Sequence, residues 1–153
     1  MALADIQQLL QDFVPEMVDE LKPEARDRAI EEARLRYSAD LPRQLVEDVT
    51  WPATSVFGPV PVGWTDDARL VDVDLPGRVT SGQSTFFAVV RTLDGWMLES
   101  VDAIGAGYVV RVSYTLPHEL DAGADSVPAA HRLAVSYYAA YLLCQQLATR
   151  FSS

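Results

Sequence analysis

The 153-residue sequence predicts an α+β fold, and three observations support this prediction. Apolar residues recur at helical spacing in the first forty residues, alternate with period two through the middle of the chain, and fill a long segment near its end. The order of helices, strands and a final helix contains no alternating βαβ pattern and no repeat, which favours antiparallel pairing. We expect a single domain over residues 1–153. In it, helices at about 4–40 and 128–151 form a bundle, the long C-terminal helix packs on the N-terminal helices, and a β-rich insertion spans about 43–118.

The first two predicted helices cover residues 4–21 and 24–38. Pro15 interrupts the first pattern, so it either kinks one helix or begins a second short one. The second helix has a narrow apolar stripe, formed by Ala25, Ala29, Ile30, Ala33 and Tyr37. Its other faces carry two ion pairs at helix-supporting spacing, Glu31–Arg34 and Glu32–Arg36.

The central part of the sequence predicts short strands separated by turns. We expect strands at residues 45–51, 69–75, 86–92, 96–98 and 108–115. Asp94-Gly95 supplies a two-residue hairpin turn between two of them. In the last strand Val110, Val112 and Tyr114 should face one way. Residues 52–67 contain three prolines and two glycines and should form a long loop, with Val60, Val62 and Trp64 in the core.

The last helix, residues 128–151, is apolar over more of its circumference than one stripe requires. Val135 and Leu142 follow helical spacing with Tyr138, while Tyr137, Tyr141 and Phe151 widen the apolar surface. Such a helix must be covered on more than one side. No Gly, Asn or Pro ends it, so we expect that further chain follows or that a neighbouring subunit covers this end. Cys144 is expected to be a small buried hydrophobic residue.

Composition excludes several classes of function. The formal net charge is −10, from 22 acidic and 12 basic residues, and such a field repels nucleic-acid phosphates and anionic lipid. A single cysteine cannot form an internal disulfide. No apolar run reaches the roughly 20 residues that span a bilayer, and the N-terminus lacks a signal-peptide pattern. We therefore expect no membrane association and synthesis in a reducing cytoplasm.

The sequence contains no constellation of catalytic residues. Residues 77–84 lack the Gly-Lys-Ser/Thr ending of a phosphate loop and are expected to form a turn, and no serine lies in a Gly-x-Ser-x-Gly motif. We therefore predict no enzyme activity, no metal site and no cofactor. The alternative is a small acidic enzyme or ligand-binding domain. It would use the Asp-rich β region with His118 and either Glu119 or Asp121. The aspartates of that region are Asp66, Asp67, Asp72 and Asp74.

A third hypothesis, an acidic inhibitor that mimics DNA, requires the acidic residues on one continuous face. Their even spread along the chain argues against it. The tyrosines of the last helix, Tyr137, Tyr138 and Tyr141, fit either the core of the domain or a subunit interface, because tyrosine buries a large area and keeps a polar tip.

Several segments together resemble the head-to-tail connector (adaptor) proteins of tailed bacteriophages and prophages. The resemblance covers most of the chain from about residue 25 onward. It rests on residues 28–43, Val46-Glu47-Asp48-Val49, Trp64, residues 71–76, 109–120, Val127-Pro128 and 134–148. The family pattern continues past the last helix into a polar segment and another helix rich in Ala, Arg and Tyr, which lie beyond the residues of this chain.

The resemblance implies a structural virion protein of the neck, assembled in the host cytoplasm. Such proteins form a ring, expected to be a dodecamer, between the portal protein and a stopper or tail-completion protein, and DNA passes through the ring as cargo. We expect the last helix to supply the subunit or portal interface, through Tyr137, Tyr138, Tyr141, Leu142, Arg150 and Phe151.

Overall fold

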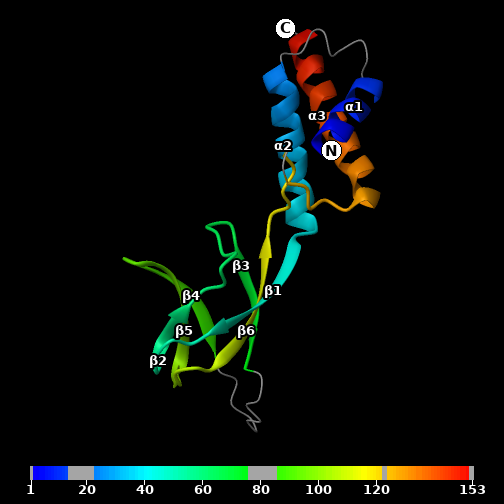
Figure 1. Cartoon of the computed structure of the whole chain (residues 1–153). Coiled ribbons are helices and arrows are strands. Elements are labelled where there is room, and N and C mark those ends of the chain that lie inside the picture. The colour runs from blue at the N-terminus through cyan, green and yellow to red at the C-terminus, as the bar shows by residue number, and fades with distance from the viewer. Residues whose placement is uncertain (1, 14–22, 76–85, 122–123, 152–153) are drawn as a thin grey trace. The chain divides into compact units, whose positions relative to one another are not determined.

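The computed structural model describes residues 2–13, 23–75, 86–121 and 124–151 (Figure 1). These residues form three α-helices and two three-stranded antiparallel sheets, so the α+β prediction is confirmed. The chain divides into two compact units. The helical unit comprises residues 1–43 and 117–153, and the β unit comprises residues 44–116.

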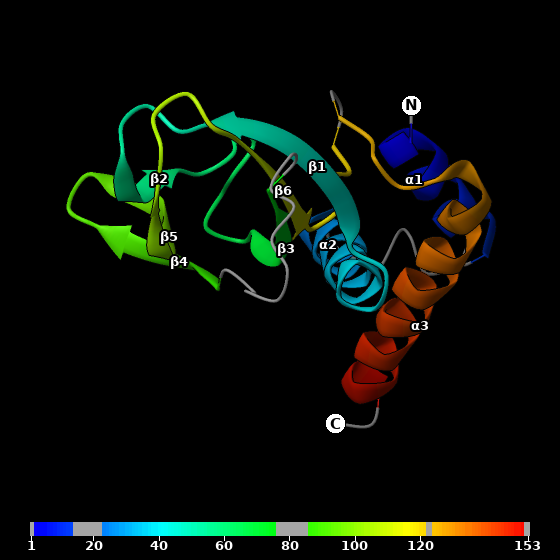
Figure 2. The same cartoon turned by 90° about the horizontal axis from the view of Figure 1, so that it is seen from below.

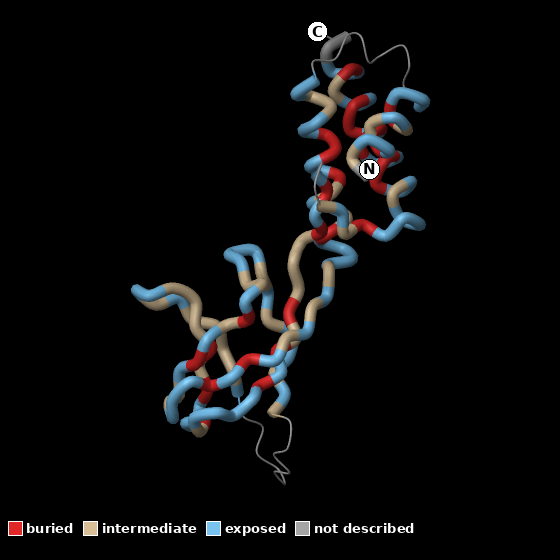
Figure 3. The backbone as a smooth tube through the Cα atoms, in the orientation of Figure 1, coloured by how far each residue is buried: buried red, intermediate tan, exposed pale blue. Residues whose placement is uncertain are grey.

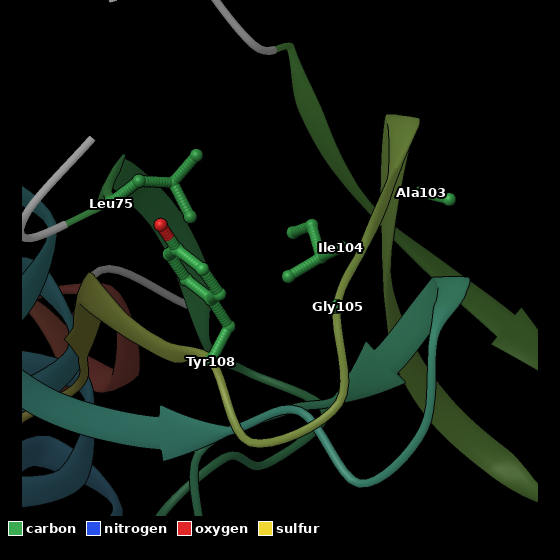
Figure 4. Close-up of a pocket in the computed structure, with 5 residues that line it drawn as sticks. All are labelled: Leu75, Ala103, Ile104, Gly105 and Tyr108. Carbon is green, nitrogen blue, oxygen red and sulfur yellow. The ribbon is translucent and has the colours of Figure 1, made fainter. Parts of the chain in front are cut away.

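The helical unit contains α1 (Ala2–Phe13), α2 (Pro23–Asp40), a 3-10 turn η1 (Ala129–His131) and α3 (Arg132–Phe151). The last helix contacts both α1 and α2, as expected, and Figure 2 gives a second view of this arrangement. Figure 3 shows buried residues on all three helices. The core is formed mainly by Ile6, Leu10, Ala29, Ile30, Ala33, Val135, Ala139, Leu142 and Leu143.

The apolar stripe predicted for α2 lies in this core. Ala29 and Ala33 are buried, and their small side chains let α2 pack closely against α3. On the outer faces, Arg34 and Glu31 form the expected ion pair at 2.5 Å. The expected Glu32–Arg36 pair does not form. Instead, Arg36 pairs with Asp40 at 3.2 Å, one helical turn toward the C-terminus.

The β unit contains two sheets with strand orders β1-β6-β3 and β2-β5-β4. Its strands are β1 (Arg43–Thr50), β2 (Ser55–Pro59), β3 (Arg69–Asp74), β4 (Phe87–Thr92), β5 (Gly95–Ile104) and β6 (Val109–Leu116). The hairpin predicted at Asp94-Gly95 joins β4 to β5, but its turn lies one residue earlier than expected, at Leu93 and Asp94. Gly95 pairs with Thr92 as the first residue of β5 and has a φ of 120°, which favours glycine. Val110, Val112 and Tyr114 are fully buried and face the core, as predicted.

The segment predicted as a loop over residues 52–67 contains strand β2, so that prediction was wrong in part. Trp51 is fully buried and packs against Gly58 of β2, where a side chain would collide with the indole ring. Val62 does not enter the core; it is fully exposed, and its backbone N–H donates to Glu47 Oε2 at 3.1 Å. Val60 and Trp64 pack against the core as expected. The turn predicted at residues 77–84 lies outside the described residues.

Candidate functional site

The outward side of α3 is the most distinctive surface of the helical unit. Residues 133–149 contain no charged side chain, although 22% of the whole chain is charged. Leu133, Tyr137, Tyr141 and Cys144 follow one another at intervals of four, four and three residues, so they line one side of the helix. Tyr137 and Tyr141 are 55% and 52% exposed. We call this surface the α3 face, and it comprises Leu133, Tyr137, Tyr138, Tyr141, Cys144 and Gln145.

Contacts between side chains fix the orientation of the aromatic rings on the α3 face. Tyr137 stacks on Phe13 of α1, with ring centroids 4.6 Å apart and an angle of 20° between the planes. Tyr138 and Tyr141 lie 5.9 Å apart, and Gln145 Nε2 donates to the Tyr141 hydroxyl at 2.5 Å. Because the rings already have defined positions, burial against a partner would restrict them little further.

A groove of about 230 Å³ runs between α2 and α3 beside Tyr138. Small side chains at Ala33 and Ala134 leave this space open. The ion pair between Arg36 and Asp40 lines the groove on the α2 side. The other residues that line it are Tyr37, Val135 and Tyr138. Tyr37 is held in place by a 2.5 Å hydrogen bond between its hydroxyl and His131 Nδ1.

The residues predicted as an interface fall into three groups. Tyr137, Tyr138 and Tyr141 lie together on the α3 face. Leu142 is 9% exposed and belongs to the core of the helical unit, so the structure does not bring it to that surface. The side chains of Arg150 and Phe151 lie outside the described residues. Cys144, expected to be buried, is exposed, because its helical phase places it beside Tyr141.

His118 has a structural role in the helical unit, where it joins segments that are distant in sequence. Its Nε2 lies 3.0 Å from the Leu41 carbonyl oxygen, and its Nδ1 lies 2.8 Å from the Ser126 carbonyl oxygen. Its backbone N–H donates to Ser38 Oγ at 2.9 Å, and Arg34 donates to its carbonyl oxygen. Both ring nitrogens of this buried side chain therefore already contact backbone oxygens.

The acidic residues next to His118 also have partners within the helical unit. Glu119 accepts a 3.5 Å hydrogen bond from Arg43, and Asp121 Oδ1 accepts one of 2.6 Å from the Ala124 backbone N–H. These contacts fix the chain between β6 and η1. They give Glu119 and Asp121 structural roles alongside that of His118.

The acidic residues of the β unit lie mainly on exposed surfaces. Asp66 accepts a 2.7 Å hydrogen bond from the Trp96 indole N–H. Arg111 forms a bidentate ion pair with Asp48, with hydrogen bonds of 2.8 and 3.0 Å. These hydrogen bonds from the guanidinium lower the pKa of Asp48. Asp72 and Asp74 are exposed on β3. Among the residues that the structure describes, no three His, Cys, Asp or Glu side chains group closely enough to hold a metal ion.

Comparisons of the chain with protein-family models, curated proteins and solved structures found no match. No helix among the described residues is both long and apolar enough to cross a membrane. The sequence left the three tyrosines open between the core of the domain and a subunit interface, and the structure places them on an exposed surface. The contribution of Phe13 and the groove depends on how three helices pack.

Proposed function

We propose that this chain is a structural subunit of a tailed-phage neck, where it forms a ring that joins the portal and head to the tail and lets DNA pass. The observation that carries the proposal is the uncharged, tyrosine-rich α3 face. This assignment combines the sequence resemblance to connector proteins with a surface that is suited to contact between subunits.

The composition of the α3 face matches that of the centre of a protein–protein interface. Interface centres are depleted in charged residues and enriched in tyrosine, and truncation of an aromatic anchor there often costs about 2 kcal/mol or more of binding free energy. A solvated helix face of a chain this rich in charge would ordinarily carry acidic and basic residues. The exposed rings of Tyr137 and Tyr141 therefore support a buried position in an assembly.

The overall charge fits passage of DNA through such a ring. At a net charge of −10 per chain, an assembly of many copies repels phosphates, so DNA would move through it without adhering. In this proposal the partners are further copies of the chain, which form a dodecamer, together with the portal protein and a stopper or tail-completion protein. The site of action is the neck of the virion, and no catalysis or cofactor is involved.

The mass of the purified chain in solution tests the proposal. We expect light scattering after size-exclusion chromatography to show a ring, at twelve times the 16.9 kDa of one chain, or a monomer that forms the ring only with the portal protein of the same phage. Tyr138→Asp or Tyr141→Asp should abolish the ring, because each substitution places a charge in the contact between subunits.

The matched control is Leu35→Asp. Leu35 is 48% exposed on α2, on the side away from the buried stripe, so this variant should still assemble. A chain that stays monomeric with and without the portal protein would rule out the proposed function. A ring that survives both tyrosine substitutions would show that the α3 face is not the contact.

A further inference from the structure

A second apolar surface lies on the outer face of the sheet β2-β5-β4. In the register of this sheet, Glu99 of β5 lies between Ala88 of β4 and Phe57 of β2. Residues directly opposite one another on neighbouring strands share a face. The next row of this face contains Val90, Met97 and Pro59. Val101 lies two residues after Glu99 on β5 and therefore on the same face. Its backbone N–H donates to the carbonyl oxygen of Phe86, just before β4, at 3.3 Å.

The opposite face of the same sheet supplies part of the β-unit core. Leu98 is fully buried there, and Phe87 and Val89 pack against the same cluster. An antiparallel sheet with one face in the core normally has a polar outer face. Here Phe86 and Val101 are 69% and 71% exposed on the outer side. We define the sheet face as Phe57, Phe86, Ala88, Val90, Met97 and Val101 around Glu99.

Glu99 determines what kind of surface can cover the sheet face. Its carboxylate makes no hydrogen bond and no ion pair with any residue in the described part of the chain. A carboxylate buried without donors is costly, and a second acid opposite it adds repulsion. The covering surface must therefore be apolar, carry hydrogen-bond donors and lack acids.

The α3 face meets each of these requirements. It is apolar and uncharged, and the hydroxyls of Tyr137 and Tyr138 have no hydrogen-bond partner among the described residues. The β unit already contains a tyrosine–carboxylate pair of this kind, because the buried Tyr114 hydroxyl donates to Glu47 Oε1. A hydroxyl from α3 could satisfy Glu99 in the same way.

Cyclic symmetry makes the pairing of two different surfaces necessary. In a ring, each subunit contacts the next through a heterologous interface, in which one surface of a copy meets a different surface of its neighbour. We infer that the sheet face of one copy receives the α3 face of the next copy, with Glu99 accepting a hydrogen bond from a tyrosine hydroxyl. This inference rests on the proposed ring and assigns its two contacting surfaces.

The single cysteine makes the contact testable by cross-linking. Cys144 is exposed on the α3 face and is the only cysteine of the chain, so disulfide formation in the unmodified protein can give nothing larger than a dimer. Val101→Cys places a second thiol on the sheet face. Mild oxidation of this variant should then link each copy to the next and produce a ladder of trimers and larger species on a non-reducing gel.

Two controls accompany this variant. Val71→Cys places a thiol on a residue of similar exposure, 61%, in the other sheet, and it should give no ladder. Removing the native thiol from the test variant, with Cys144→Ser, should reduce the ladder to dimers at most. In a separate measurement, Glu99→Lys should weaken assembly at least tenfold, whereas Glu99→Gln, which keeps an acceptor oxygen, should assemble.

The outcomes separate this inference from the proposed function. A ladder from Val101→Cys alone supports the pairing of the two surfaces. An oligomer of ring mass without a ladder, equal ladders from both cysteine variants, or a disulfide within one chain overturns the pairing and leaves the ring intact. A protein that is monomeric with and without the portal protein overturns both.

Discussion

Phe13 of α1 and Tyr137 of α3 stack against each other with their ring centroids 4.6 Å apart, although 37% and 55% of these residues remain exposed. The pair extends the α3 face onto α1, so two helices contribute to one aromatic surface. Stacked rings have few alternative positions, which lowers the entropy lost when a partner covers them. The surface is therefore largely pre-formed in the single chain.

Two substitutions in α3 should separate folding from assembly. Leu142 lies in the core, and Leu142→Asp should lower the free energy of unfolding by about 3 to 5 kcal/mol, because it removes apolar contacts and buries a charge. Tyr138 is 37% exposed, so Tyr138→Asp should keep the helical circular dichroism and shift the melting temperature only slightly. Equal losses of helical signal in both variants would contradict the placement of Tyr138 on the surface.

The contact between Gly58 and Trp51 should make Gly58→Ala costly. A Cβ atom at position 58 would lie 2.3 Å from the indole ring of Trp51, which is fully buried and cannot move aside. Overpacking of this kind should lower the free energy of unfolding by about 1 to 3 kcal/mol, measured by urea denaturation with tryptophan fluorescence. Gly105→Ala is the control, because the nearest atom there is 4.0 Å away. Equal stability of the two variants would disprove the close packing.

His118→Ala should destabilise the helical unit. A neutral imidazole has a single N–H, so the substitution removes one donated hydrogen bond to the carbonyl oxygen of Leu41 or Ser126 together with the contact of the other ring nitrogen. At about 1 kcal/mol per hydrogen bond, the loss should be about 1 to 2 kcal/mol. Thermal melting followed by helical circular dichroism measures this loss. His131→Ala, which removes one exposed contact with Tyr37, should cost less. If His118→Ala left stability unchanged, the alternative that this histidine serves a ligand site would regain support.

The Glu31–Arg34 pair should give the helical unit an acid-dependent stability. Hydrogen bonding from Arg34 lowers the pKa of Glu31 below its usual value near 4.5. The carboxylate therefore binds a proton more readily in the unfolded chain, and its contribution is present above pH 4.5 and lost as the pH falls through the folded pKa. Glu31→Gln should lower the melting temperature at neutral pH, and the difference from the unmodified protein should shrink in acid.

The control for this pH series is Glu32→Gln, which removes a neighbouring carboxylate that forms no ion pair among the described residues. It should show no such convergence with the unmodified protein. Melting temperatures at several pH values between neutral and about pH 3 would reveal the difference. A difference between Glu31→Gln and the unmodified protein that stays constant over this pH range would mean that it does not come from the charged pair.

Local patterns predicted the elements that have strong periodicity. Helical spacing identified the buried stripe of α2, and alternation identified the buried residues of β6, such as Val112 and Tyr114. Strand β2 was missed because its Gly58 and Pro59 suggest a loop. The glycine is needed only because Trp51 packs on it, and this tertiary contact leaves no periodic signal.

The candidate surface was predictable only in part for the same reason. Three tyrosines close together on a helix indicate an aromatic surface, but sequence alone does not show which of them face the core. Leu142 and Tyr138 both fit helical spacing, yet Leu142 is buried and Tyr138 is exposed. The Phe13–Tyr137 stack depends on the packing of α1 against α3, which no local pattern encodes.

The division of the chain imposes an order on its folding during synthesis. The β unit, residues 44–116, is continuous, so it leaves the ribosome complete. The helical unit is interrupted, and α1 and α2 must wait for α3 before their buried stripes are covered. Because α3 follows α1, α2 and the β unit in the chain, the surface proposed for assembly cannot form until all three of these have been synthesised.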